Sequence, residues 1–243
     1  MVSGSDGISD DRESGVVERE AAADGKARWI FLDLDGTIAD SVPGISFSLH
    51  VAFAAVGKLL PVKDVRGFIG PGIRTILKNL DGGLLESELD VMERCYRASY
   101  DHDGCLRSVL YPGVDETLRE LAKRKLQLFV VTNKPKLATA NVLDKFGLTG
   151  LFMEVVSRDS RTPVYGTKGE MLRELVEGHG VDPACARMIG DTAEDWTAAR
   201  EAHLPFIYAA YGYGDVRAAE VERIGEFAQL LKMLGQVPQS PNQ

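Results

Sequence analysis

Short apolar runs recur along the chain, each bounded by polar or turn-forming residues. The first is WIFLDL, residues 29–34, which is followed directly by an Asp-Gly pair. A short run that is largely apolar and closed by a turn signal is typical of a strand buried on both faces of a parallel sheet. Similar runs occupy residues 126–132, 151–157, 186–192 and 205–210. The pattern therefore predicts a set of buried parallel strands.

Segments with helical periodicity separate these runs. Their apolar residues gather on one helical face, as expected for a helix that packs against a sheet. The residues on these faces are Val114, Leu118 and Leu121, then Ala138, Val142 and Phe146, then Met171, Leu172, Leu175 and Val176. Strands that alternate with helices form βαβ units, in which helices cover both faces of a parallel sheet. We therefore expect an α/β fold with a Rossmann-like parallel sheet.

One long segment without strand character, residues 45–110, interrupts this alternation after the first strand. Its pattern favours several amphipathic helices, separated at Gly57, at residues 70–72 (GPG) and at residues 81–83 (DGG). Because the segment follows DLDGT directly, it must emerge beside the carboxylates of that motif. We therefore expect residues 45–110 to form a small α-helical cap domain.

The remaining sequence divides into a core and two tails. The core is expected to comprise residues 27–44 and 111–235. Residues 1–26 are rich in Gly, Ser, Asp and Glu and have no apolar period, which predicts a disordered N-terminal tail. Residues 236–243 are expected to form a C-terminal tail.

Composition narrows the classes of partner. The 243 residues are 44% hydrophobic and 26% charged, and the formal net charge is −8. An acidic balance argues against nucleic acid as the main partner, because phosphate backbones need patches of Lys and Arg. It leaves room for a small phosphorylated molecule, since a metal ion and a few local cations can reverse the field.

The cysteines and the hydropathy indicate a compartment. Cys95, Cys105 and Cys185 are odd in number and widely spaced, which favours reduced thiols. No apolar run approaches the roughly 18 residues of a membrane span, and the N-terminus lacks the apolar core of a secretory signal. We expect a cytoplasmic protein that acts without a membrane or nucleic acid, as a monomer or homodimer.

Residues able to take part in catalysis or binding gather where the predicted strands end. Loops at the carboxyl ends of the strands build the site in an open α/β sheet. The residues that fall there are Asp33, Asp35, Gly36 and Thr37 after the first strand, Thr132, Asn133 and Lys134 after the second, and Gly190, Asp191, Thr192 and Asp195 after the fourth. Acids, hydroxyls and an amide therefore meet at one edge of the sheet.

The acids suggest a metal. Asp33 and Asp35 can point the same way, because side chains alternate along an extended strand. Two close carboxylates repel each other unless one is protonated or a cation lies between them. Asp191 adds a third oxygen donor, and hard oxygen ligands without a His or Cys cluster suit Mg²⁺.

The ordered set DLDGT, helical insert, VVTNK, lone lysine and GDTAED resembles the haloacid dehalogenase superfamily of phosphohydrolases. More narrowly, the chain resembles the phosphoglycolate phosphatase-like branch with a helical (C1-type) cap. The resemblance covers about Trp29 to Gly214. It implies a strand order in which the strand before Asp33 lies between those ending in Thr132 and Asp191.

The resemblance also implies roles for the acids. Asp33 would attack phosphorus and form an aspartyl-phosphate. Asp35 would protonate the leaving alkoxide and then take a proton from the hydrolytic water. Mg²⁺ would be held by Asp33, the backbone carbonyl of Asp35 and Asp191, and would offset the repulsion between carboxylate and phosphate. Asp195 would support the metal through water or hydrogen bonds.

Other residues would bind the phosphoryl group. Thr132 and the amide after it would hold phosphoryl oxygens, with helix capping by Asn133 as an equal alternative. Lys168, in YGTKGEM, would neutralise the phosphoryl charge and brace Asp33, with Lys134 as the rival; otherwise Lys134 is expected to be solvated. Gly36 would let the chain turn beneath the phosphate.

Thr37 and the aromatic segment at residues 208–214 also allow predictions. Thr37, in DGT, is expected among the substrate-binding residues, and it favours a hydrolase over a phosphomutase. The aromatic residues of YAAYGYG, residues 208–214, are expected mostly to pack or to lie in a loop, although members of the family that the chain resembles often carry a similar Gly-Tyr-Gly near the site.

The cap carries one candidate segment. VRGFIGPGIRTIL, residues 65–77, resembles the cap segment that lies over the active site in phosphoglycolate phosphatases. Its GPG would open a helix whose N-terminus favours an anion. Arg66 and Arg74 are candidates for a substrate carboxylate or for cap–core contacts, with plain surface arginines as the alternative. Pro71 departs from the closest family patterns, so strict phosphoglycolate specificity is not implied.

Together these features predict a Mg²⁺-dependent phosphatase for a small organic phosphomonoester, phosphoglycolate-like or a sugar phosphate. A phosphomutase on the same scaffold is the first alternative, because family mutases can share the DxD pair. The second is a binding module that keeps the fold without turnover. The third is a receiver-like phosphoacceptor domain, against which the helical insert and Asp35 argue.

Overall fold

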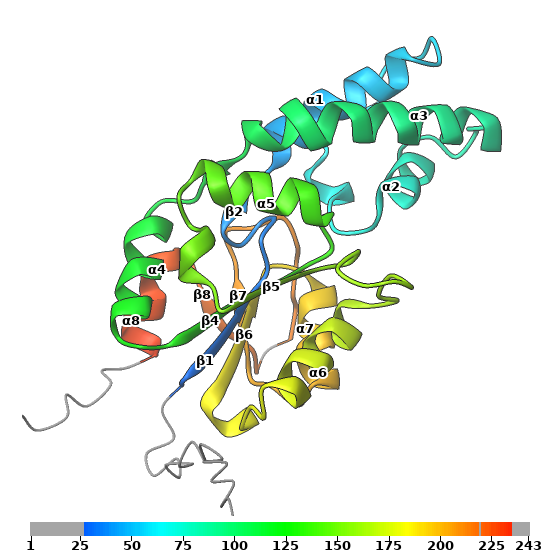
Figure 1. Cartoon of the computed structure of the whole chain (residues 1–243). Helices are drawn as coiled ribbons and strands as arrows, with labels where there is room; N and C mark the ends of the chain where they lie inside the picture. Colours follow the sequence, from blue (N-terminus) through cyan, green and yellow to red (C-terminus); the bar gives the residue numbers. More distant parts are fainter. Residues whose placement is uncertain (1–26, 219, 235–243) are drawn as a thin grey trace, which may run out of the picture.

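The computed structural model describes residues 27–218 and 220–234. The two predicted tails, residues 1–26 and 236–243, lie outside the described residues. Six parallel strands form the central sheet in the order β5-β4-β1-β6-β7-β8 (Figure 1). These strands are β1 (Trp29–Leu32), β4 (Gln127–Thr132), β5 (Glu154–Ser157), β6 (Ala186–Gly190), β7 (Phe206–Ala209) and β8 (Glu222–Ile224). The predicted α/β fold with a parallel sheet is confirmed.

The central position of β1 agrees with the expected strand order. β1 pairs with β4 on one side and β6 on the other, so that Phe31 is aligned with both Phe129 and Met188. The segments that follow β1, β4 and β6 therefore leave the sheet side by side.

Alternate residues of each strand are buried in two separate apolar clusters, one on each face of the sheet. Ile30 and Leu32 belong to a cluster on one face of the sheet, and Phe31 belongs to a cluster on the other. The first cluster includes apolar residues of α4 (Val114–Lys123), α5 (Lys136–Lys145) and α8 (Leu230–Met233), and the second those of α6 (Lys168–Gly178) and α7 (Ala193–Glu201). Because helices cover both faces of the sheet, consecutive residues of its strands are buried, which explains the continuous apolar runs in the sequence.

The inserted segment is helical, as the pattern predicts. Its α-helices are α1 (Val42–Ala54), α2 (Ile73–Leu80) and α3 (Glu86–Ser99). Short 3-10 turns η1 (Arg66–Phe68) and η3 (Cys105–Arg107) and a π-helical turn η2 (Tyr100–Gly104) complete it, and further 3-10 turns in the core are η4 (Thr149–Leu151), η5 (Pro183–Cys185) and η6 (Phe227–Gln229).

The two connections between cap and core pair with each other. β2 (Ala39–Asp40) and β3 (Val109–Leu110) form an antiparallel ribbon in which Ala39 is aligned with Leu110. β3 lies within residues 45–110, where no strand was expected, because a two-residue strand has no period to detect. The predicted boundary between residues 44 and 45 falls inside α1.

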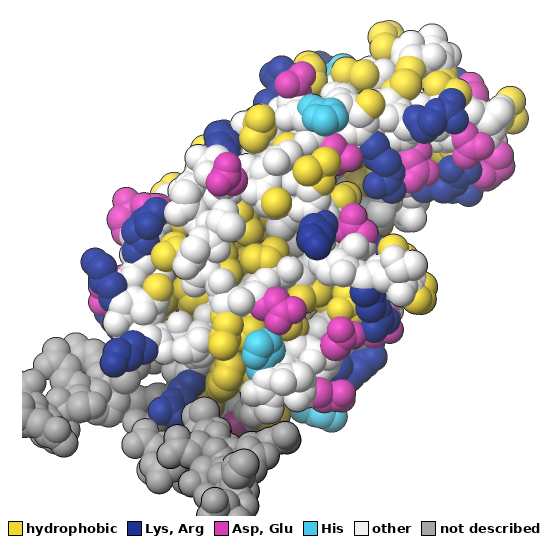
Figure 2. All heavy atoms as spheres, viewed as in Figure 1, with side chains coloured by type: hydrophobic (Ala, Val, Ile, Leu, Met, Phe, Trp, Pro, Cys, Tyr) yellow, Lys and Arg dark blue, Asp and Glu magenta, His cyan; other side chains and the backbone are white. Residues whose placement is uncertain are grey.

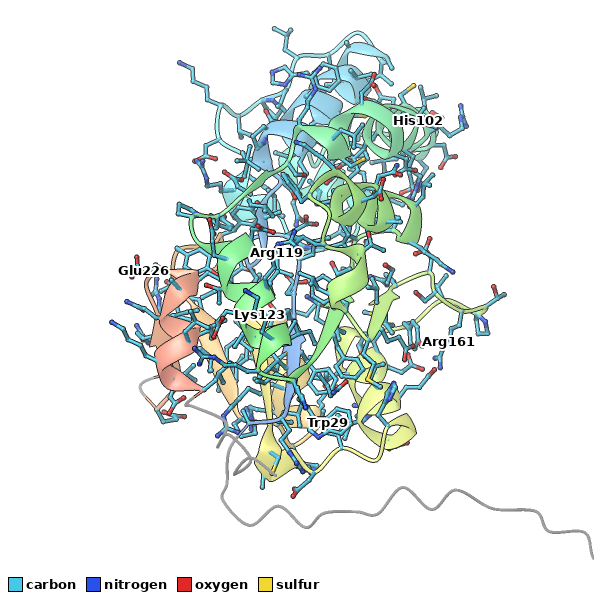
Figure 3. The ribbon with its side chains drawn as sticks, turned by 60° about the vertical axis from the view of Figure 1, so that its left-hand side comes forward. Trp29, His102, Arg119, Lys123, Arg161 and Glu226 are labelled. Carbon is cyan, nitrogen blue, oxygen red and sulfur yellow. The ribbon has the colours of Figure 1, made fainter. Side chains whose placement is uncertain are left out.

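The cap lies over one end of the sheet. Figure 3 shows Trp29, at the start of β1, at the end of the molecule away from the cap, where His102 is labelled. The strands therefore run toward the cap, and their carboxyl ends face it.

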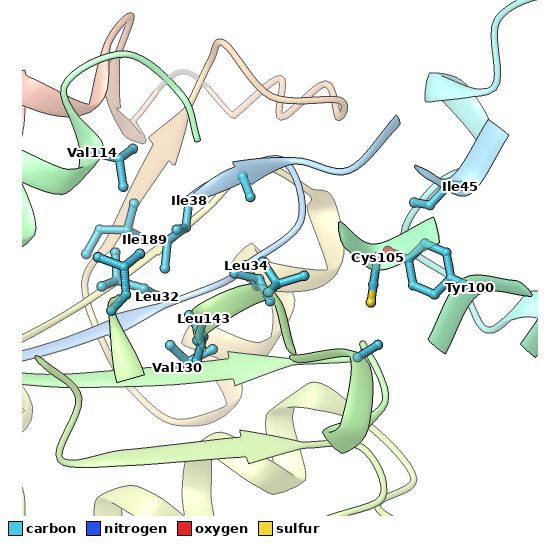
Figure 4. Close-up of a cluster of buried hydrophobic side chains, with 14 of the residues drawn as sticks. Leu32, Leu34, Ile38, Ile45, Tyr100, Cys105, Val114, Val130, Leu143 and Ile189 are labelled. Carbon is cyan, nitrogen blue, oxygen red and sulfur yellow. The ribbon is translucent and has the colours of Figure 1, made fainter. Parts of the chain in front are cut away.

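Cap and core share one buried apolar cluster. Leu34, which follows β1 and is fully buried, belongs to the same cluster as Val130 of the core and Cys105 and Tyr100 of the cap. Figure 4 shows Leu34 between the core residues and these two cap residues.

The outer surface carries charges of both signs. On the face in Figure 2, acidic and basic side chains are interspersed over both the cap and the core. Within the part of the chain that the structure describes, no helix is both long and apolar enough to cross a membrane.

Candidate active site

Three buried carboxylates meet at the carboxyl ends of β1 and β6. Asp33 follows β1, Asp191 follows β6, and Asp195 lies in the first turn of α7. One carboxylate oxygen from each lies within 4.8 Å of the other two. All three side chains are buried. Close carboxylates in such surroundings need a compensating cation.

Lys168 supplies one positive charge. It begins α6, and its Nζ lies 2.8 Å from Asp33 Oδ1 and 2.5 Å from Asp195 Oδ1. Burial alone lowers the pKa of Lys168, but Asp195 and Asp33 raise it overall, so the amine stays charged. The structure thus brings the predicted Lys168 to Asp33.

Asp195 organises the loop after β6. Its Oδ2 accepts hydrogen bonds from the backbone N–H groups of Asp191 at 3.2 Å and Thr192 at 2.9 Å, and from Thr192 Oγ1 at 2.7 Å. Thr192 in turn caps α7 by accepting from Asp195 N. Since Oδ1 contacts Lys168, both oxygens of Asp195 have partners.

Asp191 is held by groups from distant parts of the chain. The Thr37 hydroxyl donates to Oδ1 at 3.2 Å, and the Tyr213 backbone N–H donates to Oδ2 at 2.7 Å. A Cβ at Gly36 would lie 2.2 Å from Asp191 Oδ2, and one at Gly212 would lie 2.3 Å from Asp191 Cβ. The two glycines therefore provide the space that this carboxylate needs, and at Gly36 the φ of +88° also favours glycine.

Tyr213 lies in the Gly-Tyr-Gly that resembles one found near the site in family members, but the sequence analysis gave it no role there. Its backbone contacts Asp191, and its hydroxyl accepts a hydrogen bond from Ser41 N at 2.6 Å. The flanking glycines Gly212 and Gly214 were the available signal, because both approach the Asp191 segment too closely for a side chain.

The electrostatics of the acids indicate an excess of negative charge. Burial, and then the neighbouring Asp195, raise the pKa of Asp191 to about 7. Burial also raises the pKa of Asp33, although Lys168 opposes this. A divalent cation would favour the ionised forms. The oxygen-only donor set and this surplus charge fit Mg²⁺.

Asp35 points to different partners. Its Oδ1 accepts hydrogen bonds from the Ser41 hydroxyl and from Lys134 Nζ, the latter at 2.8 Å. Lys134 also contacts the Tyr100 hydroxyl of the cap. The expectation that Lys134 is solvated is wrong, because its side chain is only 1% exposed.

Thr132 and Asn133 end β4 on the floor of the site. The Asn133 amide nitrogen donates to the Gly70 carbonyl in the cap at 3.4 Å. Its Oδ1 is buried and has no hydrogen-bond partner within residues 27–218 and 220–234. The alternative that Asn133 caps the next helix is wrong, since Pro135 occupies that position and Asp159 accepts from Lys136 N.

A cavity of about 440 Å³ separates the acids from the cap. Asp33, Asp35, Thr132, Asn133 and Lys168 line its core side. Its cap side includes Ile45, Ile69, Ile73, Ile76, Tyr96 and Tyr100, and the GPG at residues 70–72. The predicted core residues and the predicted cap segment therefore border the same space.

The two candidate arginines of the cap, Arg66 and Arg74, pair with acids of the cap. Arg74 lines the cavity, but its guanidinium lies 2.5 Å from Glu86, 2.8 Å from Asp90 and 3.2 Å from Glu93. Arg66 pairs with Asp64 on the exposed surface.

Comparison with known proteins gives consistent matches. The model of the haloacid dehalogenase-like hydrolase family matches residues 30–209. A phosphoglycolate phosphatase of Agrobacterium fabrum is 33% identical over 214 residues, which cover 83% of this chain and 90% of that protein. A phosphoglycolate phosphatase of Psychrobacter arcticus is 29% identical over 218 residues, covering 84% and 94%.

A solved structure agrees with these matches. The crystal structure of a predicted phosphoglycolate phosphatase from Haemophilus somnus superposes with a TM-score of 0.77 at 28% identity. The superposition covers 86% of this chain and 98% of that one.

Proposed function

This chain belongs to the haloacid dehalogenase-like hydrolase family, and on that premise we propose that it hydrolyses a small organic phosphomonoester through a phosphorylated Asp33. The observation that carries the proposal is the buried pair of Asp33 and Lys168 at the floor of a cavity that Asp35 also lines. The names of the relatives support phosphoglycolate as the first substrate to test.

Asp33 has one oxygen suited to attack. Lys168 contacts Oδ1, so Oδ2 is the oxygen that would form the bond to phosphorus. As that bond forms, the bond between phosphorus and the leaving oxygen breaks. Lys168 offsets the charge of the phosphoryl group, and it keeps Asp33 oriented.

Asp35 would move the protons. It would give a proton to the departing alkoxide, and in the second half of the reaction it would take one from the attacking water. That water would break the bond between phosphorus and Asp33 and release phosphate. Thr132 and the unpartnered Asn133 Oδ1 lie on the same cavity wall and would contact the phosphoryl group or the water around it.

Asp33, Asp191 and the backbone carbonyl of Asp35 would hold Mg²⁺, with Asp195 fixing the Asp191 loop. When bound, the ion would supply positive charge that offsets repulsion between the phosphate and the acids. We also propose a reducing, cytoplasmic location, which the free thiols of Cys95 and Cys105 support.

The decisive experiment measures phosphate release from a panel of phosphoesters, with Mg²⁺ and with a chelator. The panel includes phosphoglycolate, sugar phosphates, nucleoside monophosphates and pyrophosphate. We expect Mg²⁺-dependent release that falls by about 10³-fold or more in Asp33→Asn. Asp115→Asn is the matched control, because Asp115 pairs with Arg119 on α4, away from the cavity.

Other outcomes would favour the alternatives. A requirement for a sugar bisphosphate without net phosphate release would indicate a phosphomutase. A long-lived phosphorylated Asp33 without turnover would indicate a phosphoacceptor domain. Metal binding without any reaction would indicate a binding module.

A further inference from the structure

Lys134 is a buried lysine between core and cap. Its side chain is 1% exposed, and its Nζ lies 2.8 Å from Asp35 Oδ1. A charged amine in such a place is costly unless it is paired and hydrogen-bonded. The buried amine of Lys134 is therefore paired with Asp35, the residue that we expect to transfer protons.

Within residues 27–218 and 220–234, both side-chain hydrogen bonds to the Asp35 carboxylate fall on the same oxygen. The Ser41 hydroxyl and Lys134 Nζ each donate to Oδ1. Ser41 is itself an acceptor for the Ser108 hydroxyl at 3.2 Å, so the two segments at the ends of the β2–β3 ribbon meet beside this oxygen. With Oδ1 fixed, Oδ2 is the oxygen left to exchange a proton with a leaving group.

The other side of Lys134 contacts the cap. Its Nζ contacts the Tyr100 hydroxyl and lies 4.7 Å from the centre of the Tyr100 ring. Tyr100 is buried in the π-helical turn and stacks on Tyr96 with 5.3 Å between ring centres. Tyr96 and Tyr100 both line the cavity. Lys134 thus connects a rigid aromatic pair of the cap to the acid of the core.

We propose that Lys134, held by Tyr100, is a positioning residue that orients the Asp35 carboxylate for proton transfer. The inference rests on the proposed function, in which Asp35 protonates the leaving oxygen. It assigns Lys134 a task separate from that of Lys168, which contacts Asp33 and Asp195.

A positioning role has a specific kinetic signature. Proton transfer to a leaving group depends on the orientation of the acid, and it matters more as the leaving oxygen becomes more basic. Phenyl phosphate releases a basic phenolate, with a pKa of about 10 like that of a tyrosine side chain. p-Nitrophenyl phosphate has nearly the same shape but releases a much less basic phenolate. Misplacing Asp35 should therefore slow phenyl phosphate more.

The first variant is Lys134→Met, which keeps most of the apolar stem and removes the charge. We expect kcat/KM for phenyl phosphate to fall about 10-fold or more, and that for p-nitrophenyl phosphate to fall at most about 3-fold. Asp35→Asn should show the same selectivity with a larger loss, of about 10²-fold or more on phenyl phosphate. Circular dichroism and melting curves would check that each variant is folded.

Lys145→Met is the matched control. Lys145 also joins the core to the cap connection, since its Nζ lies 2.8 Å from the carbonyl oxygens of both Leu106 and Ser108. It does not line the cavity. We expect it to leave the ratio of the two kcat/KM values unchanged, so a change in Lys134→Met cannot be ascribed to loosened attachment of the cap.

Tyr100→Phe provides a second test that keeps the ring and its stacking. It removes only the hydroxyl that contacts Lys134, and we expect the same selectivity with a smaller loss, about 3-fold on phenyl phosphate. If Lys134→Met does not fold, this variant decides the question.

Four results would overturn the inference. Equal losses on both substrates in Lys134→Met and Tyr100→Phe would indicate a purely structural role. Unchanged kinetics in both would indicate no role. If Asp35→Asn shows the selectivity and the Lys134 and Tyr100 variants do not, only this inference fails. If Asp35→Asn lacks the selectivity as well, the proposed acid is wrong and the proposed function must be revised with it.

Discussion

At the scale of single residues, the site depends on keeping like charges close together. Asp191 lies near Asp33 and Asp195, and two glycines leave it the room to do so. The raised pKa of Asp191 reports the cost of this arrangement. The carboxylates of this site repel one another, and a bound cation would reduce that repulsion. The site therefore favours cation binding.

The raised pKa of Asp191 predicts how the stability of the folded protein depends on pH. Without metal, the folded state holds a proton on Asp191 up to a pKa of about 7, whereas the unfolded state loses it near the ordinary value of 3.8. The folded state thus binds more protons between these values, and stability conferred by the protonated form is lost as pH rises through this window. Mg²⁺ competes with that proton, so its stabilising effect should grow over the same window.

Melting temperatures measured from pH 5 to pH 8, with saturating Mg²⁺ and with a chelator, would test this prediction. We expect the difference between the two curves to widen with pH and to level off above about pH 7. Asp191→Asn should remove most of the widening. A difference that is constant with pH would show that Asp191 is already ionised in the metal-free protein.

The sequence was a better guide to some residues than to others. Asp33 and Asp191 were placed at one sheet edge by the apolar runs before them, whereas the roles of Asp33, Asp191 and Lys168 came from the resemblance to a known family. Lys134 was misjudged because its burial depends on Tyr100, which belongs to the cap and is distant in sequence. A single chain reveals local patterns, whereas the partner of a buried charge is set by tertiary packing.

At the scale of elements, the same distinction holds. β1, β4 and β6 were predicted from apolar runs because they are covered on both faces. The β2–β3 ribbon and β8 were not, since strands of two or three residues have no detectable period. The α2–α3 pair shows a further limit: the sequence offered Arg74 for a substrate carboxylate or for cap–core contacts, and it gave no sign of the three acids of α3 that pair with Arg74 at the edge of the cavity.

Because Arg74 of α2 pairs with three acids of α3, we predict that it stabilises the packing of these two helices. In Arg74→Gln, Asp90 would lose the cation that pairs with it, while Glu86 and Glu93 would keep Lys78 and Arg97, so we expect a small but measurable drop in melting temperature. KM for the best phosphoester should change less than about 3-fold. Arg66→Gln is the control, since Arg66 has one exposed acidic partner and lies outside the cavity lining.

The two measured quantities separate the possibilities for Arg74. A large rise in KM with little change in melting temperature would instead assign Arg74 to substrate binding, as the resemblance first suggested.

At the scale of the whole molecule, cap and core share one of the two apolar clusters, the one that also covers the α4–α5 face of the sheet. Leu34 lies at their junction and is fully buried. Cap and core should therefore lose their structure together, because neither keeps a complete core without the other.

Leu34→Ala tests this coupling. We expect it to lower the free energy of unfolding by about 2–5 kcal/mol, as for other large-to-small changes in a core. Fluorescence of Trp29 and Trp196, both in the core, and helical circular dichroism should share one denaturant midpoint before and after the change. Leu59→Ala, at a side chain that is 91% exposed, should alter stability by less than about 0.5 kcal/mol. Two separate midpoints would contradict the shared core.

The central place of β1 in the sheet also has a consequence for biosynthesis. Asp33 directly follows the first strand of the sheet, whereas Lys168 begins α6 and Asp191 directly follows β6, and both come after the whole cap in the sequence. A ribosome therefore completes the nucleophile long before it makes the lysine that offsets its charge and the acid with which it would share a metal ion. Contacts across such sequence separations form late, since the chain must first close a long loop. A nascent chain that stops before α6 carries the attacking carboxylate without Lys168 or Asp191, so hydrolysis must await nearly complete translation.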